Sequence, residues 1–319
     1  MCEADMKRCI EKANAQYRAC RIPGLVRTRY GTLLGYYECR NTVSDWAQID
    51  LKVIRSTDSG ENWQTVCMFP GDGNTLNNPV MIVDGETIHF LFCRNYRKLY
   101  ACRSTDDGLT FTVPAEKTQA FEAAEGYNAA AVGPGHGIAH NGVLLIPAWF
   151  AYNKEEPRAH RPSAIRMLYS QDHGENWKLS SCIGEEMLRN PSECALAVLP
   201  DQRVLLSIRH ENLLRRRAFS VSTNGTDGWT NPFFADEVPD PICQGSMAHT
   251  DKAVFHINCA SEKERQKLTL RIWQENGNRE ILIDETGGYA DLATDGKTVW
   301  ILYERDVSND GLYFTQIHL

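Results

Sequence analysis

Apolar and polar residues follow one another in short β-rich runs along most of the chain, separated by polar turns. Residues 17–26 and 31–38 show the arrangement first, as a strand, a turn containing Gly31 and a second strand. Residues 1–16 carry charges throughout and lack this pattern, so they are expected to form a short helix or an irregular arm. The pattern therefore predicts an all-β domain over residues 17–319.

One polar turn recurs between these runs. Residues 56–63 read S-T-D-S-G-E-N-W, residues 170–177 repeat the pattern unbroken, and residues 104–111 repeat it with Phe in place of Trp. Two worn copies lie at residues 222–229 and 274–277. Ser and Asp side chains bond backbone groups two residues on, Gly supplies a positive φ, and the aromatic residue packs beneath. These carboxylates are therefore expected to tie hairpins rather than to act as catalytic acids.

The spacing of the turns predicts the architecture. Asp58, Asp106, Asp172, Asn224 and Glu275 are separated by 48, 66, 52 and 51 residues. A period near 50 built from short strands is typical of a propeller blade, and 319 residues at that period make about six blades. We expect a six-bladed β-propeller of four-stranded antiparallel blades. The last strand, near residues 311–319, should complete a blade begun near the N-terminus, because closure removes exposed sheet edges.

Composition narrows the class of protein and of partner. Hydrophobic content of 42% and charged content of 24% are ordinary for a soluble globular protein. A net charge of −7 with no compensating basic run argues against nucleic acid as a partner. No apolar stretch is long enough to span a bilayer, and residues 1–15 lack the apolar core of a signal peptide. A cytoplasmic protein is expected, or a secreted one if a leader was removed.

The eleven cysteines are scattered singly, with no C-x-x-C pair and no histidine at zinc-like spacing. An odd number without a signal peptide favours reduced, mostly buried thiols over disulfides. No metal ion and no cofactor is expected.

Several polar residues stand at strand ends or beside apolar residues. Arg21 precedes an Ile-Pro pair in strand context and is expected to point into a lined cavity. Glu193 opens one strand of a hairpin and Arg209, 16 residues on, closes its partner. From the residues alone, this pair is as consistent with a cross-strand ion pair as with a functional site.

The Arg-Ile-Pro sequence at residues 21–23, followed by several S-x-D-x-G-x-x-W turns, resembles the sialidase (neuraminidase) family of six-bladed propellers. The resemblance covers nearly the whole chain, from residue 17 to the last strand. It implies a retaining exo-α-sialidase that removes terminal sialic acid from glycans or free sialosides through a tyrosyl-enzyme intermediate.

The resemblance also implies a substrate clamp. Three guanidiniums, those of Arg21, Arg209 and Arg265, would bind the substrate carboxylate through charge-assisted bonds. Glu304, at the end of a strand, would orient Arg21. Arg271 competes with Arg265 for the third place, but it lies within a strand pattern and is expected to face outward.

The catalytic groups follow from the same resemblance. Tyr289, after two glycines, would be the nucleophile, and Glu193 would take its proton. A neutral tyrosine avoids the repulsion that a carboxylate nucleophile would meet from the substrate's own charge. Asp45, 24 residues after Arg21, would be the acid/base group. Asp50 is the nearby alternative, although it falls inside the strand pattern.

Two further residues are expected to contact the substrate. Trp46 adjoins Asp45, and His136 lies in the Gly-Pro-Gly-His-Gly segment at residues 133–137. The loop at residues 152–163 is cationic, which suits an anionic ligand and equally suits a solvated loop.

Alternatives remain open at this stage. Gln48 stands where many relatives have a third acidic residue, so the preferred sugar could be a related ulosonic acid of the KDN or Kdo type. A non-catalytic, glycan-binding propeller is the alternative from a different class. The sequence does not define linkage preference, physiological substrate or oligomeric state.

Overall fold

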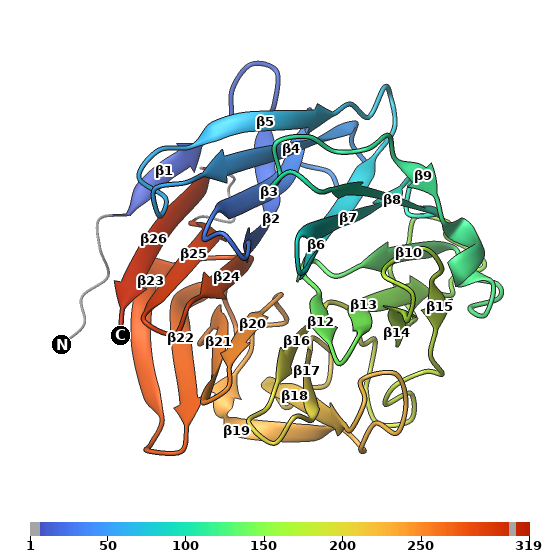
Figure 1. Cartoon of the computed structure of the whole chain (residues 1–319). Helices are drawn as coiled ribbons and strands as arrows, with labels where there is room; N and C mark the ends of the chain where they lie inside the picture. The colour runs from blue at the N-terminus through green and yellow to red at the C-terminus, as the bar shows by residue number, and fades with distance from the viewer. Residues whose placement is uncertain (1–6, 306–310) are drawn as a thin grey trace.

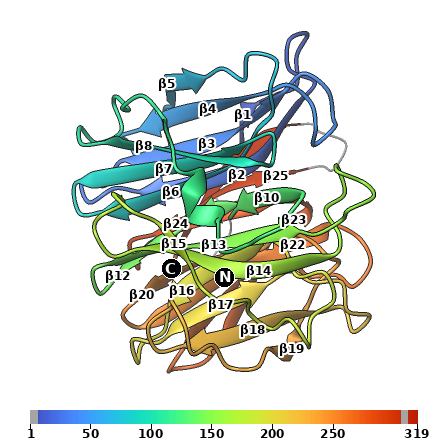
Figure 2. The ribbon, with the colours of Figure 1, turned by 90° about the vertical axis from the view of Figure 1, so that its right-hand side faces the viewer.

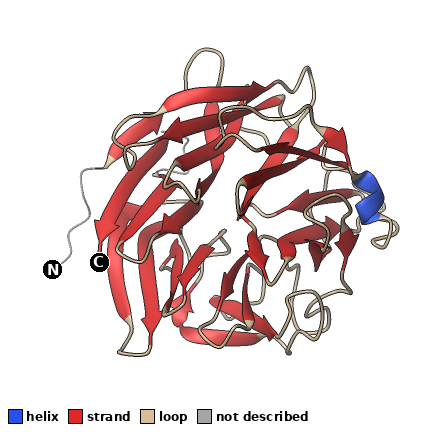
Figure 3. Cartoon of the chain, viewed as in Figure 1, coloured by secondary structure: helices blue, strands red, loops and turns tan. Residues whose placement is uncertain are grey.

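The computed structural model describes residues 7–305 and 311–319, and strands make up most of it (Figure 3). Six sheets stand around a central axis (Figure 1), and the molecule is a disc when seen from the side (Figure 2). The 3₁₀ turn η1 (Thr118–Phe121) is the only helix among the described residues. Those residues accordingly contain no helix long and apolar enough to cross a membrane. The prediction of an all-β, six-bladed propeller is confirmed.

Each blade contains four antiparallel strands, ordered here from the central channel outward. The first three blades consist of β2 (Ala19–Arg27), β3 (Leu33–Arg40), β4 (Ile49–Ser56) and β5 (Gln64–Phe69); β6 (Leu76–Asp84), β7 (Thr87–Arg94), β8 (Lys98–Ser104) and β9 (Ala115–Glu116); and β10 (Ala129–Val132), β13 (Val143–Ala151), β14 (Ser163–Ser170) and β15 (Lys178–Leu179). The next two consist of β16 (Cys194–Val198), β17 (Val204–Ile208), β18 (Arg216–Ser222) and β19 (Phe233–Pro239); and β20 (Ser246–Thr250), β21 (Ala253–Cys259), β22 (Gln266–Gln274) and β23 (Arg279–Thr286).

The sixth blade joins the two ends of the chain. It consists of β24 (Ala290–Thr294), β25 (Thr298–Glu304), β26 (Leu312–His318) and β1 (Arg8–Glu11). Thus residues 8–11, which lie in the segment expected to be a helix or an arm, form the outermost strand and pair antiparallel with β26. The recurring polar turns each connect the third and fourth strands of a blade. In the sixth blade those two strands come from opposite ends of the chain, which explains five turns in six blades.

The polar turns have the predicted local structure. Ser56 Oγ donates to the Asp58 carboxylate, which also accepts a bond of 2.9 Å from the backbone N–H of Asn62. Gly60 has a φ of 89°, and a Cβ there would lie 2.3 Å from Phe314 of the neighbouring blade. The N–H groups of Asn62 and the Ser56 hydroxyl lower the pKa of Asp58 to about 2. The turn therefore holds an ionised carboxylate and brings adjacent blades into close contact.

The apolar core of the described residues is divided among the blade interfaces. Six main clusters of buried side chains lie between adjacent blades, one at each interface around the ring. Leu25 and Trp300, for example, belong to the cluster that joins the first and sixth blades. Because burial of each large apolar side chain contributes about 1.5–3 kcal/mol, these interfaces hold the inner strands in place.

The segment at residues 133–137 departs from the regular blade. β11 (Gly135–His136) leaves the third blade and pairs in parallel with β6, and β12 (Ile138–His140) then returns to β13. A Cβ at Gly137 would lie 2.5 Å from the carbonyl oxygen of Leu145, so this crossing requires a glycine. The excursion carries His136 into the central channel.

The innermost strands run in one direction along the channel. The N–H of Ile22 bonds Glu304, which also accepts the N–H of Tyr289, and the N–H of Leu25 bonds Asp291. The starts of β2 and β24 therefore lie at one mouth of the channel and their ends at the other. Second strands such as β17 and β25 return to the first mouth, so residues at the starts of inner strands meet residues at the ends of second strands.

Candidate active site

A buried tyrosine forms the centre of the first mouth. Tyr289, which is 6% exposed, donates its hydroxyl hydrogen to Glu193 Oε1 at 2.8 Å. Arg209 Nη1 donates to the same hydroxyl at 2.8 Å and to Glu193 Oε2. Arg209 and Glu193 are adjacent because the β16–β17 hairpin ends there, with the Arg209 N–H bonded to the Glu193 carbonyl at 3.0 Å. The predicted hairpin geometry is thus present, and both of its end residues contact Tyr289.

Glu304 ties the first strand of the chain to the start of β24. Its carboxylate accepts Arg21 Nε at 3.1 Å and Arg21 Nη2 at 3.2 Å. The backbone N–H groups of Ile22 and Tyr289 donate to the same carboxylate at 3.0 and 3.3 Å. A buried carboxylate with four donors is well satisfied, and it fixes the guanidinium of Arg21 relative to Tyr289.

Three guanidiniums surround the Tyr289 ring. The Cζ atoms of Arg21 and Arg265 each lie 5.2 Å from the ring centroid, and Arg209 bonds the hydroxyl. The predicted clamp arginines therefore converge, although they come from three separate blades. Such a concentration of positive charge is complementary to an anionic group.

Arg271 lies elsewhere. Its side chain is buried and donates to Asn258 at 2.6 Å and to Glu280 at 2.7 Å. The prediction that it faces outward into solvent was wrong, because the strand packs this face against its neighbours. Arg265, in the loop before β22, is the arginine that reaches Tyr289.

The surroundings of Tyr289 act on its ionisation in opposite directions. Burial is the largest effect and raises the pKa, Glu193 raises it further, and the charges of Arg209 and Arg265 lower it. The net shift is upward, so the phenol is neutral at neutral pH. Glu193 is positioned to accept its proton, and Arg209 to stabilise the phenolate that results.

Asp45 lies in the loop between β3 and β4 and is bonded to Arg40. The side chain is 46% exposed and accepts Arg40 Nη1 at 2.7 Å. Partial burial acts to raise the pKa of Asp45, but the adjacent Arg40 and the charge of Arg21 outweigh it and the pKa is lowered. Asp50, the alternative, instead accepts bonds from Tyr17 and from the N–H of Gly71 in its own blade.

Arg40 and Glu38 were not singled out from the sequence as site residues. Arg40 is 1% exposed and donates to Glu38 through Nε at 2.7 Å and to Asp45 through Nη1. Glu38 also accepts the N–H of Asn78. A signal was available, because residues two apart in a strand share a face and a buried Glu-x-Arg pair is uncommon there.

Trp46 belongs to an aromatic group beside Asp45. Its ring lies 4.7 Å from that of Tyr96 and 5.6 Å from that of His160, and Arg158 lies over it at 5.8 Å. Arg158 and His160 come from the cationic loop noted in the sequence. The charge of Asp45 acts on the pKa of His160, which places this loop near the predicted acid/base residue.

His136 is not part of this group. Its Nδ1 is 2.8 Å from Asp291 Oδ1, and the ring lines a cavity at the opposite mouth, beside the ends of β2 and β24. The expectation that His136 contacts a substrate together with the arginines is not supported, because β11 places it further along the channel than Tyr289.

Two cysteines pack beneath the tyrosine. Cys243 and Cys259 form a buried cluster with Ile22 and Tyr289, and Cys259 Sγ approaches the Gly288 carbonyl at 3.6 Å. Seven of the ten cysteines that the structure describes are buried, in line with the expectation of mostly buried thiols. No three His, Cys, Asp or Glu side chains of the described residues gather as a metal site would require.

Fold and site together define a sialidase-like β-propeller, a six-bladed ring with arginines gathered around a Tyr–Glu pair at one mouth. The chain belongs to the family described as BNR repeat-like domain, which matches residues 67–283.

Known proteins of this kind are similar over nearly the whole chain. A sialidase of Bacteroides fragilis is 26% identical over 91% of this chain, and an exo-alpha-sialidase of Arthroderma benhamiae is 28% identical over 92% of it and 80% of the relative. The solved structure of the Hadza microbial sialidase Hz136 superposes with a TM-score of 0.84 at 26% identity, covering 98% of this chain and 68% of that chain. The chain spans 61% of the length of the B. fragilis relative.

Proposed function

We propose that this protein is a retaining exo-α-sialidase. The observation that carries the proposal is the Tyr289 hydroxyl, bonded to Glu193 and Arg209 at 2.8 Å and surrounded by three guanidiniums. The sialidase names of the relatives agree with it. The substrate is a terminal sialic acid on a glycan or a free sialoside.

Arg21, Arg209 and Arg265 bind the carboxylate that sialic acids carry on the anomeric carbon. Bidentate guanidinium–carboxylate bonds fix the plane of that group as well as its position. Because Arg21 and Arg265 also lie over the Tyr289 ring, a carboxylate held between them lies next to the tyrosine. The clamp therefore brings the anomeric carbon to the nucleophile.

In the first step the Tyr289 oxygen attacks the anomeric carbon while its proton passes to Glu193. The bond to the leaving oxygen breaks, and Asp45 donates the proton that this oxygen takes up. A glycosyl-tyrosine with inverted configuration results. Tyrosine-nucleophile sialidases are the known exception to the two-carboxylate rule for glycosidases.

In the second step Asp45, now ionised, removes a proton from water. The water oxygen attacks the anomeric carbon, the tyrosine oxygen leaves, and Glu193 returns its proton to that oxygen. Two inversions give net retention, so the α-anomer of the free sugar is formed first.

The lowered pKa of Asp45 in the free protein fits the second step directly and the first step once substrate is bound. Arg40 and Arg21 favour the ionised form of Asp45. A substrate carboxylate on Arg21 neutralises part of that positive charge, which raises the Asp45 pKa toward the protonated form that the first step needs. Substrate binding thus prepares the general acid.

The test is turnover of fluorogenic α-ketosides together with NMR of the earliest product. We expect hydrolysis of the α-ketoside of N-acetylneuraminic acid, with the α-anomer appearing before mutarotation. First-formed β-anomer would contradict the tyrosyl intermediate. Preferred turnover of a KDN or Kdo ketoside would retain the mechanism and change the sugar. Binding of a sialoside without turnover of any ketoside would identify a glycan-binding propeller instead.

A further inference from the structure

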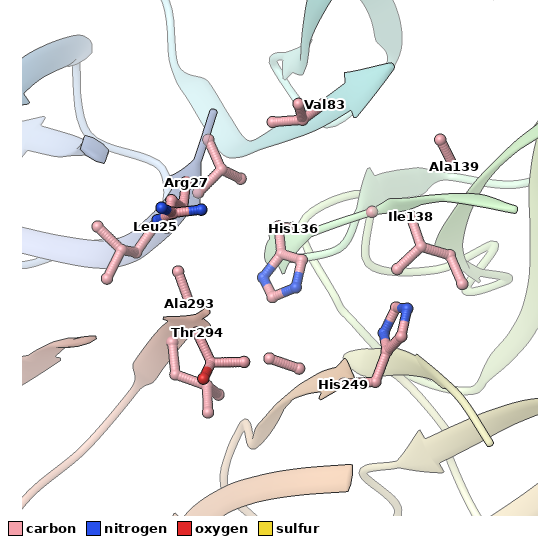
Figure 4. A pocket seen from close by; sticks show the side chains of 13 residues that line it. Leu25, Arg27, Val83, His136, Ile138, Ala139, His249, Ala293 and Thr294 are labelled. Carbon is pink, nitrogen blue, oxygen red and sulfur yellow. The ribbon is translucent and has the colours of Figure 1, made fainter. Parts of the chain in front are cut away.

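The second mouth of the channel contains a cavity that the proposed reaction does not use. Its volume is about 200 Å³, and its walls are the last residues of β2, β20 and β24 together with β11 and β12 (Figure 4). Most of the lining is apolar, including Leu25, Ile138 and Leu292. Three side chains bring polar groups to it: Arg27, His136 and His249. Small-molecule sites commonly combine apolar walls with a few polar groups in this way.

A buried carboxylate favours the charged form of His136. Asp291 is fully buried and accepts His136 Nδ1 at 2.8 Å, the N–H of Leu25 at 2.8 Å and the Ser246 hydroxyl. Burial acts to lower the pKa of His136, but the charge and hydrogen bond of Asp291 outweigh it and the pKa is raised. Since Nδ1 is engaged by Asp291, Nε2 is the ring nitrogen left to donate to a ligand.

Arg27 supplies a second positive charge. Its guanidinium stacks on Trp300 at 5.6 Å, and its buried Nε has no hydrogen-bond partner. Within the described part of the chain no carboxylate lies within ion-pair distance of it, although Asp295 is near enough for the charge of Arg27 to lower its pKa. An arginine of this kind retains donors for an incoming anion.

His249, on the opposite wall, stays neutral. Burial and the charge of His136 lower its pKa to about 4, so at neutral pH it offers one N–H without adding charge. The other lining groups near it, such as Ala248 and Ala139, are methyl groups. The cavity therefore combines one fixed cation and one favoured cation with an apolar wall.

We propose that this second mouth is a binding site for a short-chain aliphatic carboxylate. The carboxylate accepts bonds from Arg27 and His136, and the aliphatic body packs on Leu25, Ile138 and Leu292. Inorganic phosphate fits the same donors less well, because an apolar wall leaves part of its oxygen surface without partners. The site is independent of the sialidase clamp, which lies at the other mouth.

The experiment uses ¹³C-labelled butyrate at constant ionic strength with a chelator present, because the clamp arginines could also bind a carboxylate. Binding is followed by broadening of the butyrate signal and by the imidazole signals of His136 and His249. Four proteins are compared: wild type, Arg27→Gln, Arg265→Gln in the clamp, and Arg29→Gln. Arg29, an exposed partner of Glu86 two residues after Arg27, is the matched control.

We expect a Kd on the order of 1 mM in the wild type. Arg27→Gln should weaken binding at least about tenfold, because a charged hydrogen bond is lost, whereas Arg265→Gln and Arg29→Gln should keep the shifts of both histidines. His249→Gln, which removes no charge, should weaken binding less and remains informative if Arg27→Gln fails to fold.

Three results would overturn the proposal. Butyrate signals that respond to Arg265→Gln but not to Arg27→Gln would place the carboxylate in the clamp. Histidine signals that do not move at saturating butyrate would show that the cavity is not its site. Equal competition by phosphate or chloride would identify a general anion site in place of a carboxylate site.

Discussion

Carboxylates occupy two contrasting regions of this propeller, the outer polar turns and the first mouth of the channel. In the turns, Asp58 and Asp172 are bonded by groups no more than four residues away. At the mouth, Glu193 and Glu304 are bonded by Tyr289 and Arg21, 96 and 283 residues away. The first group stabilises a local shape, whereas the second exists only once the ring is closed.

The two regions also differ in what holds the negative charge. Asp58 is held by backbone N–H and hydroxyl donors at the surface, while Glu304 is buried and faces a guanidinium. Loss of a turn carboxylate should therefore affect stability alone. Loss of a group at the mouth should affect catalysis far more than stability.

The largest effect is expected from removing the tyrosine hydroxyl. Tyr289→Phe should lower kcat on an α-sialoside by at least about 10³-fold, because no other group at the site can form the glycosyl intermediate. The matched control is Tyr303→Phe, which removes a buried hydroxyl bonded to Asp284 at 3.0 Å outside the site. The control should keep near-normal kcat at some cost in Tm. Equal losses in both variants would mean that Tyr289 is structural.

The clamp gives the next largest effect. Arg265→Ala should cost on the order of 2–5 kcal/mol of transition-state binding, or about thirtyfold to a few thousandfold in kcat/KM. Arg271→Ala should instead lower Tm, since Asn258 and Glu280 lose their partner, while the folded enzyme keeps its activity. Steady-state kinetics and thermal unfolding of both variants decide the matter. The reverse pattern would assign the third clamp position to Arg271.

Asp45 should show an effect that depends on the leaving group. Asp45→Ala should slow hydrolysis of alkyl sialosides by about a hundredfold or more, the usual contribution of a general acid. An activated aryl sialoside needs little protonation and should slow only a few-fold. The ratio of the two rates in wild type and variant is the measurement. Asp50→Ala, which removes the partner of Tyr17, serves as the control and should leave the ratio unchanged.

The sequence allowed the fold to be predicted because its signals are local. Ser, Asp and Gly at fixed offsets specify each turn, and the spacing of the turns specifies the blade. Six blades with five turns follow once the ends of the chain share a blade. The strand β1 could not be predicted, because its four residues gain their conformation by pairing with β26.

The site was predicted through a resemblance and not from local signals. Arg21, Arg209 and Arg265 were each identified by motif, and their convergence on Tyr289 depends on ring closure. His136 shows the limit of this reasoning. The glycine-rich motif was correctly associated with the channel, but only the pairing of β11 with β6 determines at which depth the imidazole lies.

The smallest effect concerns a turn carboxylate and tests the other side of the contrast. Asp106 accepts bonds from Ser104 and from both the N–H and the hydroxyl of Thr110. Although burial opposes the change, these donors lower its pKa from 3.8 to about 2. The ionised form is therefore favoured by folding, and its contribution to stability is complete above about pH 4 and disappears as the pH falls through 2.

Asp106→Ala should accordingly lower Tm by about 1–3 °C at pH 7, since the turn lies at the surface and a domain of this size responds weakly to the loss of one cap. The difference in Tm from the wild type should narrow between pH 4 and pH 2, and kcat/KM should stay unchanged because the turn is on the rim of a blade. Asp236→Ala, at an exposed position of β19, is the control and should leave Tm unchanged throughout this range. A Tm difference that persisted at pH 2 would show that the Asp106 side chain stabilises the turn by packing and not by its charge.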